Sequence, residues 1–228
     1  MPRQTQELRL AIWDVDGTLV DSRRVIQTCM EAAFRETGLP PPDYEATRKI
    51  VGLGLYEGCA ILAPPDTDRG RLEMLVMNYK NAFTLHRTSD GFHEPLYEGA
   101  LETLETLRDA GWLMAVATGK SHRGLASLFA THAIEKYFDT VWCADDGPGK
   151  PNPFMVEQAM GALGCSPGQS LMIGDAIHDI AMGRAAGVRS FGVSWGFGRA
   201  DELQDAGAHE VHHDFCTLRE SLNVFAAG

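Results

Sequence analysis

The residues best suited to chemistry are two aspartates near the N-terminus. Asp14 and Asp16 stand two positions apart in the segment DVDGTLVDS, directly after the apolar run 10–13. Carboxylates at the carboxyl end of a strand lie where open α/β sheets bind their ligands. One carboxylate of such a pair can act as a nucleophile while the other exchanges protons, and the pair can bind a hard cation. Because aspartates before Gly-Thr are equally typical of a simple turn, other residues must decide between the two interpretations.

Three further polar groups follow apolar, strand-like runs later in the chain. Thr118 and Gly119 lie in VATGKS, Lys150 lies in GKPNP, and Asp175 with Asp179 lies in IGDAIHD. The carboxyl ends of adjacent parallel strands line one crevice, so we expect these groups to converge there with the two N-terminal aspartates. Each group also has a structural interpretation: a strand-ending turn, a solvated lysine, or an aspartate in the first turn of a helix. Their combination favours function.

The combined inventory suits phosphoryl transfer. We predict that Asp14 attacks phosphorus and forms an aspartyl phosphate. Asp16 is predicted to protonate the leaving oxygen and then to take a proton from the attacking water. Thr118 and Gly119 would bind phosphate oxygens, with glycine allowing close approach of the backbone, and Lys150 would offset the negative charge of the transferring group.

The same inventory predicts Mg²⁺ as the cofactor. Mg²⁺ prefers oxygen ligands and combines a few carboxylates with substrate phosphate and water. We predict Asp14, Asp16 and Asp175 as the metal ligands and Asp179 as a group that supports the metal site from outside them.

The elements that must position these residues follow from the hydrophobic pattern. Strands and helices alternate from Pro95 onward, which is typical of a parallel sheet covered on both faces. The predicted strands are 10–13, 113–117, 140–143, 171–173, 190–193 and a last short one at 210–212. Between Ser22 and about Ser89 only helical spacing occurs. We therefore predict an α/β fold in which residues 1–21 and 90–228 form the core and residues 22–89 an inserted helical cap domain.

Composition limits the classes of function. The chain has 228 residues, of which 44% are hydrophobic, enough for a substantial core. Its formal net charge of −11 argues against nucleic acid or an anionic membrane as a partner, because both require a basic surface. An anionic substrate would therefore need a local cation. The five cysteines are scattered and odd in number, and we expect no membrane span or signal peptide, so the predicted location is cytoplasmic.

These residues resemble the four motifs of the haloacid dehalogenase superfamily, and the resemblance covers nearly the whole chain. The motifs are DVDGT, the strand-terminal Thr118-Gly119, Lys150-Pro151, and Gly174-Asp175 with Asp179. The resemblance implies a Rossmann-like core and a cap inserted at the family's first cap position. Asp16 separates the chain from the true dehalogenases and the phosphonatase-like members, and Val15 separates it from the membrane-pump ATPases. The phosphatase and phosphomutase branch is left.

Within that branch, the segment 48–62 is similar to the substrate-facing stretch of phosphoglycolate phosphatases. The resemblance implies that Gly52, Leu53 and Arg48 of the cap face the substrate. β-Phosphoglucomutases usually carry an arginine shortly after the matching glycine, where this chain has Leu55. We therefore expect a Mg²⁺-dependent phosphatase of a small phosphomonoester, with phosphoglycolate as the first guess. The alternatives are a phosphomutase of the β-phosphoglucomutase type and a non-catalytic phospho-accepting or binding module. The expected partner is a small phosphorylated metabolite, with the chain a monomer or homodimer.

Overall fold

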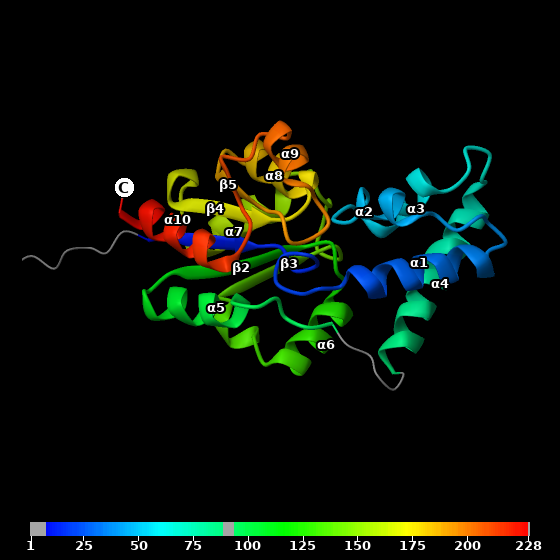
Figure 1. The fold of residues 1–228 in the computed structure, drawn as a ribbon, viewed down its shortest axis with the longest axis horizontal. Helices are drawn as coiled ribbons and strands as arrows, with labels where there is room; N and C mark the ends of the chain where they lie inside the picture. Colours follow the sequence, from blue (N-terminus) through cyan, green and yellow to red (C-terminus); the bar gives the residue numbers. More distant parts are fainter. Residues whose placement is uncertain (1–7, 89–93, 228) are drawn as a thin grey trace, which may run out of the picture.

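Six parallel strands form the sheet that carries the site. The computed structural model describes residues 8–88 and 94–227, and in it the strand order is β3-β2-β1-β4-β5-β6 (Figure 1). The strands are β1 (Leu10–Trp13), β2 (Leu113–Thr118), β3 (Thr140–Cys143), β4 (Ser170–Gly174), β5 (Arg189–Val193) and β6 (Glu210–His212). All neighbouring pairs are parallel. The predicted α/β fold with a parallel sheet is confirmed.

Strand β1 is apolar throughout because both of its faces are covered. All four of its residues are fully buried. Successive side chains of a strand point to opposite faces, so Ala11 and Trp13 enter one hydrophobic cluster while Leu10 and Ile12 enter the other. A central strand flanked by two cores is rigid, which gives the residue that follows it a well-defined position.

Helices from the second half of the chain supply both covering layers. Helices α5 (Ala100–Asp109), α6 (His122–His132) and α10 (Phe215–Ala227) contribute to the cluster that contains Trp13. Helices α7 (Phe154–Leu163) and α8 (Ile177–Ala185) contribute to the cluster that contains Ile12, and the short α9 (Ala200–Asp205) lies beside β5 and β6. In Figure 1, α5 and α6 lie below the strands and α8 lies above them.

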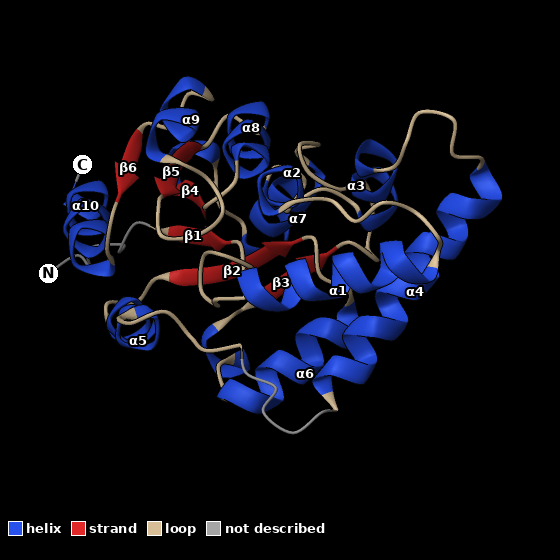
Figure 2. Cartoon of the chain, turned by 45° about the vertical axis from the view of Figure 1, so that its right-hand side comes forward, coloured by secondary structure: helices blue, strands red, loops and turns tan. Residues whose placement is uncertain are grey.

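The four helices encoded between the first and second strands form a separate layer with a core of its own. They are α1 (Arg23–Glu36), α2 (Tyr44–Arg48), α3 (Leu55–Leu62) and α4 (Arg69–Arg87). Phe34, Cys59 and Leu75 are among the residues buried between them. Figures 1 and 2 show these helices beyond one end of the strands, with α1 and α4 side by side. We propose that they are the cap domain expected for residues 22–89.

One local detail differs from the sequence-based expectation. The proline-rich sequence of residues 39–45 is typical of a loop, but helix α2 begins at Tyr44. The reason is that the side chain of Asp43 accepts a hydrogen bond from the Ala46 N–H at 2.8 Å and thereby caps the helix. Across residues 8–88 and 94–227, no helix combines the length and the apolar character that crossing a membrane requires.

Candidate active site

The site is built around Asp14, which directly follows β1. Its main-chain N–H donates to the carbonyl of Ile173 at 2.9 Å, so the parallel pairing of β1 with β4 extends to this residue. Its side chain is buried and accepts a hydrogen bond from Lys150 Nζ at 2.5 Å. Burial raises the pKa of Asp14 to about 7, although the Lys150 ammonium acts to lower it. The carboxylate is therefore largely shielded from solvent, which disfavours its charged form.

Lys150 is a fully enclosed cation between two carboxylates. Its Nζ lies 2.5 Å from an oxygen of Asp14 and 2.5 Å from an oxygen of Asp179. These two acidic partners raise the pKa of Lys150 even though burial opposes its charge. A buried lysine is rare unless it is paired, so this lysine is not the solvated residue that its sequence context alone would also allow.

Asp175 follows β4 and is held by two hydrogen bonds. Its carboxylate accepts from Thr18 Oγ1 at 3.0 Å and from the main-chain N–H of Phe197 at 2.7 Å. Burial, followed by the nearby charges of Asp14 and Asp179, raises the pKa of Asp175 well above its ordinary value. The fit around this carboxylate is so close that residue 17 must be glycine.

Gly17 explains the glycine of the DVDGT segment. Its φ is +84°, a conformation that side chains disfavour. A Cβ atom at this position would lie 2.1 Å from Asp175 Oδ2. The turn therefore needs glycine both for its backbone conformation and for the space that Asp175 occupies.

Three carboxylates converge at this point. Asp14, Asp175 and Asp179 each offer an oxygen within 4.8 Å of the others, and all three side chains are buried. One lysine cannot neutralise three carboxylates, and an all-oxygen donor set of excess negative charge suits Mg²⁺. The residues present therefore fit the predicted metal. Asp179, which we had placed outside the ligand set, lies within this group because its helix α8 begins directly after Asp175.

Asp16 differs from its predicted place among the metal ligands. Its carboxylate lies outside the three-carboxylate group and forms an ion pair with Lys120 Nζ at 2.9 Å. Lys120 also lies 3.6 Å from Glu94 Oε1. The assignment of Asp16 as a metal ligand therefore stays a prediction, and in this structure its side chain pairs with Lys120, which follows the end of β2. Sequence reasoning missed Lys120 as a site residue, although its position immediately after Thr118 and Gly119 was an available signal.

Thr118 and Gly119 lie where strand β2 ends. Thr118 is buried, and its Oγ1 accepts a hydrogen bond from the Lys120 N–H at 3.3 Å. A Cβ atom on Gly119 would lie 3.3 Å from the carbonyl oxygen of Gly52 and 3.4 Å from that of Leu53. The loop between α2 and α3 therefore contacts the end of β2, which brings two of the three predicted substrate-facing cap residues to the site.

The structure does not bring the third of these cap residues, Arg48, into the cavity lining. Its buried guanidinium donates two hydrogen bonds of 2.7 Å to the carboxylate of Glu202, one of 2.9 Å to Glu45 and one of 3.3 Å to the Phe197 carbonyl. With its donors directed to these partners, Arg48 joins the helical layer to helix α9 and does not line the active-site cavity. It therefore holds the two layers together.

This contact leads to a prediction about stability. Glu202→Gln should lower the free energy of unfolding by about 1 kcal/mol at pH 7, between the values for an exposed pair and for a charged hydrogen bond. Hydrogen bonding by Arg48 lowers the pKa of Glu202 to about 2. The stabilisation is therefore complete above pH 4.5 and is lost as the pH falls toward 2. Urea unfolding at pH 7 and pH 3 measures the effect, with the exposed Glu220→Gln as the control. Equal stability of both variants at pH 7 would contradict this role of Arg48.

The converging residues open into one cavity of about 720 Å³ between the helical layer and the sheet. Its floor is formed by Asp14, Asp16, Thr118 and Gly119, and the loop with Gly52 contributes to its wall. This volume lies in the range of pockets that enclose small-molecule ligands. The predicted nucleophile thus faces a space in which a substrate can bind.

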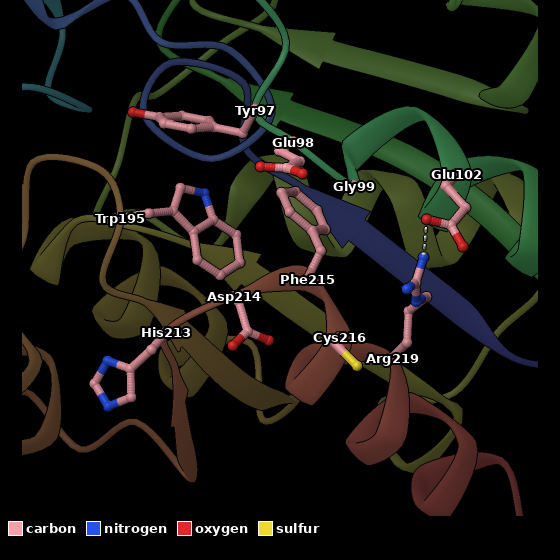
Figure 3. Close-up of a pocket in the computed structure, with 10 residues that line it drawn as sticks. All are labelled: Tyr97, Glu98, Gly99, Glu102, Trp195, His213, Asp214, Phe215, Cys216 and Arg219. Atoms are coloured by element: carbon pink, nitrogen blue, oxygen red, sulfur yellow. Dashed lines mark ion pairs between the residues drawn. The ribbon is translucent and has the colours of Figure 1, made fainter.

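A second, smaller cavity of about 410 Å³ lies beside helices α5 and α10 (Figure 3). Tyr97, Trp195 and Phe215 line it, and Arg219 forms an ion pair of 2.9 Å with Glu102. Trp195 Nε1 donates to the carbonyl of Thr18 at 3.0 Å. This indole therefore supports the turn whose hydroxyl holds Asp175.

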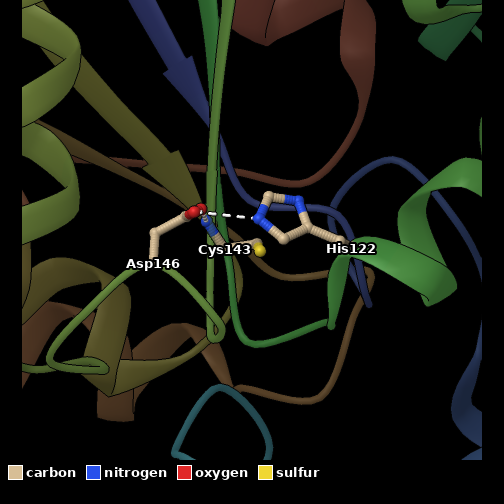
Figure 4. Close-up of side chains that lie close together, drawn as sticks. All are labelled: His122, Cys143 and Asp146. Atoms are coloured by element: carbon tan, nitrogen blue, oxygen red, sulfur yellow. Dashed lines mark hydrogen bonds and ion pairs between the residues drawn. The ribbon is translucent and has the colours of Figure 1, made fainter.

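A cluster of one histidine, one cysteine and one aspartate lies at the carboxyl end of β3 (Figure 4). His122 Nε2 lies 2.8 Å from Asp146 Oδ1, and Cys143 offers its sulfur close to both. Burial raises the pKa of the Cys143 thiol to about 11. Because metals bind the thiolate, this shift disfavours metal binding by the cluster at neutral pH.

Comparison of the sequence and the fold with known proteins identifies one family of hydrolases. The haloacid dehalogenase-like hydrolase family matches residues 11–193. The "Probable phosphatase IndB" of Dickeya dadantii is 34% identical over 86% of each chain. The phosphoglycolate phosphatase of Vibrio parahaemolyticus is 29% identical over 97% of this chain and 99% of its own. A crystal structure of a predicted phosphatase from Clostridium acetobutylicum is 24% identical and has the same fold, with a TM-score of 0.84 over 95% of this chain and 99% of its own.

Proposed function

Because the chain belongs to the haloacid dehalogenase-like hydrolase family, in its phosphoglycolate phosphatase-like branch, we propose that it is a Mg²⁺-dependent phosphatase that works through an aspartyl phosphate on Asp14. The observation that carries the proposal is the position of the Asp14 carboxylate. It stands on the floor of the cavity between the helical layer and the sheet, in contact with a buried lysine and next to two further carboxylates. Phosphoglycolate is the first substrate to test, because relatives of similar length carry that name.

The first chemical step uses Asp14 as the nucleophile. An oxygen of its carboxylate forms a bond to phosphorus while the bond from phosphorus to the substrate oxygen breaks. Thr118 Oγ1 and the Gly119 N–H would donate to phosphate oxygens, which the position of both residues in the cavity lining supports, and Lys150 lies beside the attacking carboxylate. Mg²⁺, held by Asp14, Asp175 and Asp179, would supply positive charge that stabilises the transferring group.

The second step returns the enzyme to its starting state. Asp16 gives its proton to the leaving oxygen in the first step and then accepts a proton from the water that attacks phosphorus. Phosphate is released and the Asp14 carboxylate is restored. The loop that carries Gly52 and Leu53 contacts Gly119, which supports a role for the helical cap in excluding other water while Asp14 is being phosphorylated.

A phosphate-release screen over phosphorylated metabolites with Mg²⁺ tests the proposal. We expect turnover with Mg²⁺ and none in excess chelator, because three buried carboxylates require a cation to bind another anion. Mg²⁺ should also stabilise the protein by about 2.7 kcal/mol at one hundred times its Kd, seen as a higher Tm. Asp175→Asn is expected to weaken this Mg²⁺-dependent rise in Tm, whereas the exposed Asp66→Asn should leave it unchanged. Full activity in chelator would refute the proposed metal dependence.

A further inference from the structure

One face of helix α4 lines the active-site cavity with both rings and cations. Its cavity-lining positions follow the i, i+3, i+4, i+7, i+8, i+11 spacing of one helix face: Val76, Tyr79, Lys80, Phe83, Thr84 and Arg87. A helix that only packs against its neighbours turns apolar side chains inward and charges outward. Two of these six cavity-lining residues are cations.

Other positions of α4 expose large apolar side chains, which also differs from that pattern. Met77 is 58% exposed and Leu85 is 71% exposed, although both are large apolar side chains. Lys80 and Arg87, in contrast, contribute to the cavity wall. Packing alone would favour the reverse arrangement, so the charges on the cavity side of α4 point to a binding role.

A further cation comes from the core. Arg123 of helix α6 lines the same cavity, and its Nη2 donates to Thr84 Oγ1 at 3.3 Å. Within residues 8–88 and 94–227, no carboxylate oxygen lies within 4.0 Å of Lys80, Arg87 or Arg123. The nearest described interaction of Arg87 is with the ring of Phe83, whose centroid is 5.2 Å from the guanidinium carbon.

The cavity is therefore polarised. Its floor carries Asp14 and Asp16, where the transferred phosphate would bind, and its wall at α4 and α6 carries Lys80, Arg87 and Arg123, which form no ion pair within the described part of the chain. In a chain with a net charge of −11, cations grouped on one wall of one cavity provide the local positive potential that an anion needs. The transferred phosphate has Lys150 and the metal site already, so this wall suits a different anionic group.

The cavity also has apolar lining. Ile26, Met30, Val51 and Phe83 contribute to it. A volume of about 720 Å³ exceeds what a phosphate with a two-carbon tail requires. The space thus favours a substrate with an apolar body between two charged ends.

On the basis of the phosphatase function proposed above, we infer that the substrate carries a second anion, which Lys80, Arg87 and Arg123 bind, separated from the transferred phosphate by an apolar body. A carboxylate and a second phosphate share the chemistry that these cations recognise. Phosphoglycolate meets the requirement for a second anion but leaves the apolar part of the cavity unfilled.

Three compounds with one ring and different second groups test the inference: phenyl phosphate, 4-carboxyphenyl phosphate and 1,4-phenylene bisphosphate. We expect kcat/KM to be at least about tenfold higher for one or both of the compounds with a second anionic group than for phenyl phosphate. The compound with the higher value identifies carboxylate or phosphate as the second anion. The double variant Lys80→Met/Arg123→Met should bring this ratio close to one, mainly through KM, because a uniform binding interaction is lost.

Arg69→Met is the matched control, because Arg69 lies on the same helix but outside the cavity. It removes one positive charge from α4, as Lys80→Met does, and should keep the substrate preference of the wild type. Equal kcat/KM for all three compounds in the wild type, or an equal loss of preference in the control, would overturn the inference while leaving the phosphatase function intact.

Absence of phosphate release from all three compounds would instead count against the phosphatase function. The anion site is then tested separately by calorimetric titration of the same compounds into Asp14→Asn, which removes the nucleophile but leaves the cavity wall. Tighter binding of a compound with a second anionic group than of phenyl phosphate, reduced by the double variant, supports the inference. Equal affinity for all three compounds overturns it.

Discussion

Asp14→Asn is expected to lower phosphate release by about 10⁴-fold or more while the protein stays folded. The amide keeps the shape of the side chain but cannot attack phosphorus as a carboxylate does. Stability should change little, because the substitution also removes one of three buried carboxylates that repel one another. Phosphate release under single- and multiple-turnover conditions measures the loss, and a thermal melt by circular dichroism measures the fold.

A surface substitution of the same kind provides the control. Asp66 is exposed in the cap, and Asp66→Asn makes the same chemical change away from the site. It should retain wild-type turnover. A labelled phosphoryl group from substrate should be trapped on the wild type and on this control, but not on Asp14→Asn. Turnover by Asp14→Asn above about 1% of wild type would exclude Asp14 as the nucleophile, since loss of a nucleophile costs far more.

Lys150→Met should destabilise the protein by about 3 kcal/mol at pH 8 and also abolish turnover. Methionine matches lysine in length but leaves Asp14 and Asp179 buried without their cation. In contrast with the surface pairs of this protein, this pair is enclosed, so water cannot replace the lost partner. Urea unfolding and phosphate release measure the two effects.

The pH dependence of this destabilisation has a defined sign. Burial already raises the pKa of Asp14 to about 7, and loss of the lysine raises it further. In the unfolded chain an aspartate has a pKa near 4. When folding raises that pKa, the group destabilises the folded state more and more as the pH rises above about 4. The cost of Lys150→Met should therefore be smaller at pH 5 than at pH 8. The exposed Lys49→Met should show no such trend. A cost independent of pH would contradict the enclosed ion pair.

Strand positions could be predicted because their signals are local. The apolar run 10–13 and the stretches 140–143 and 210–212 match β1, β3 and β6 residue for residue. A strand covered on both faces must be apolar throughout, and that requirement is visible in the run itself. The end of each run then identifies the residue that emerges at the edge of the sheet, which is why Asp14, Thr118 and Asp175 could be expected to converge.

Partners of charged side chains could not be predicted in the same way. Arg48 was expected to face substrate, yet its partner Glu202 lies 154 positions away in the sequence. Asp16 was expected to bind metal, but Lys120 at the end of another strand holds its carboxylate. Neither choice leaves a local pattern, because each depends on how the cap and the core are placed relative to one another.

The sequence by itself thus determined the α/β fold and the set of groups at the strand ends, because hydrophobic periodicity and turn residues act over a few positions. Only the tertiary structure decided which charged side chains form ion pairs with one another. It enclosed Lys150 between Asp14 and Asp179, tied Arg48 to helix α9 and turned Lys80 and Arg87 toward the cavity. The physical reason is that ion pairing requires contact within a few ångströms, and the packing of distant segments sets those distances.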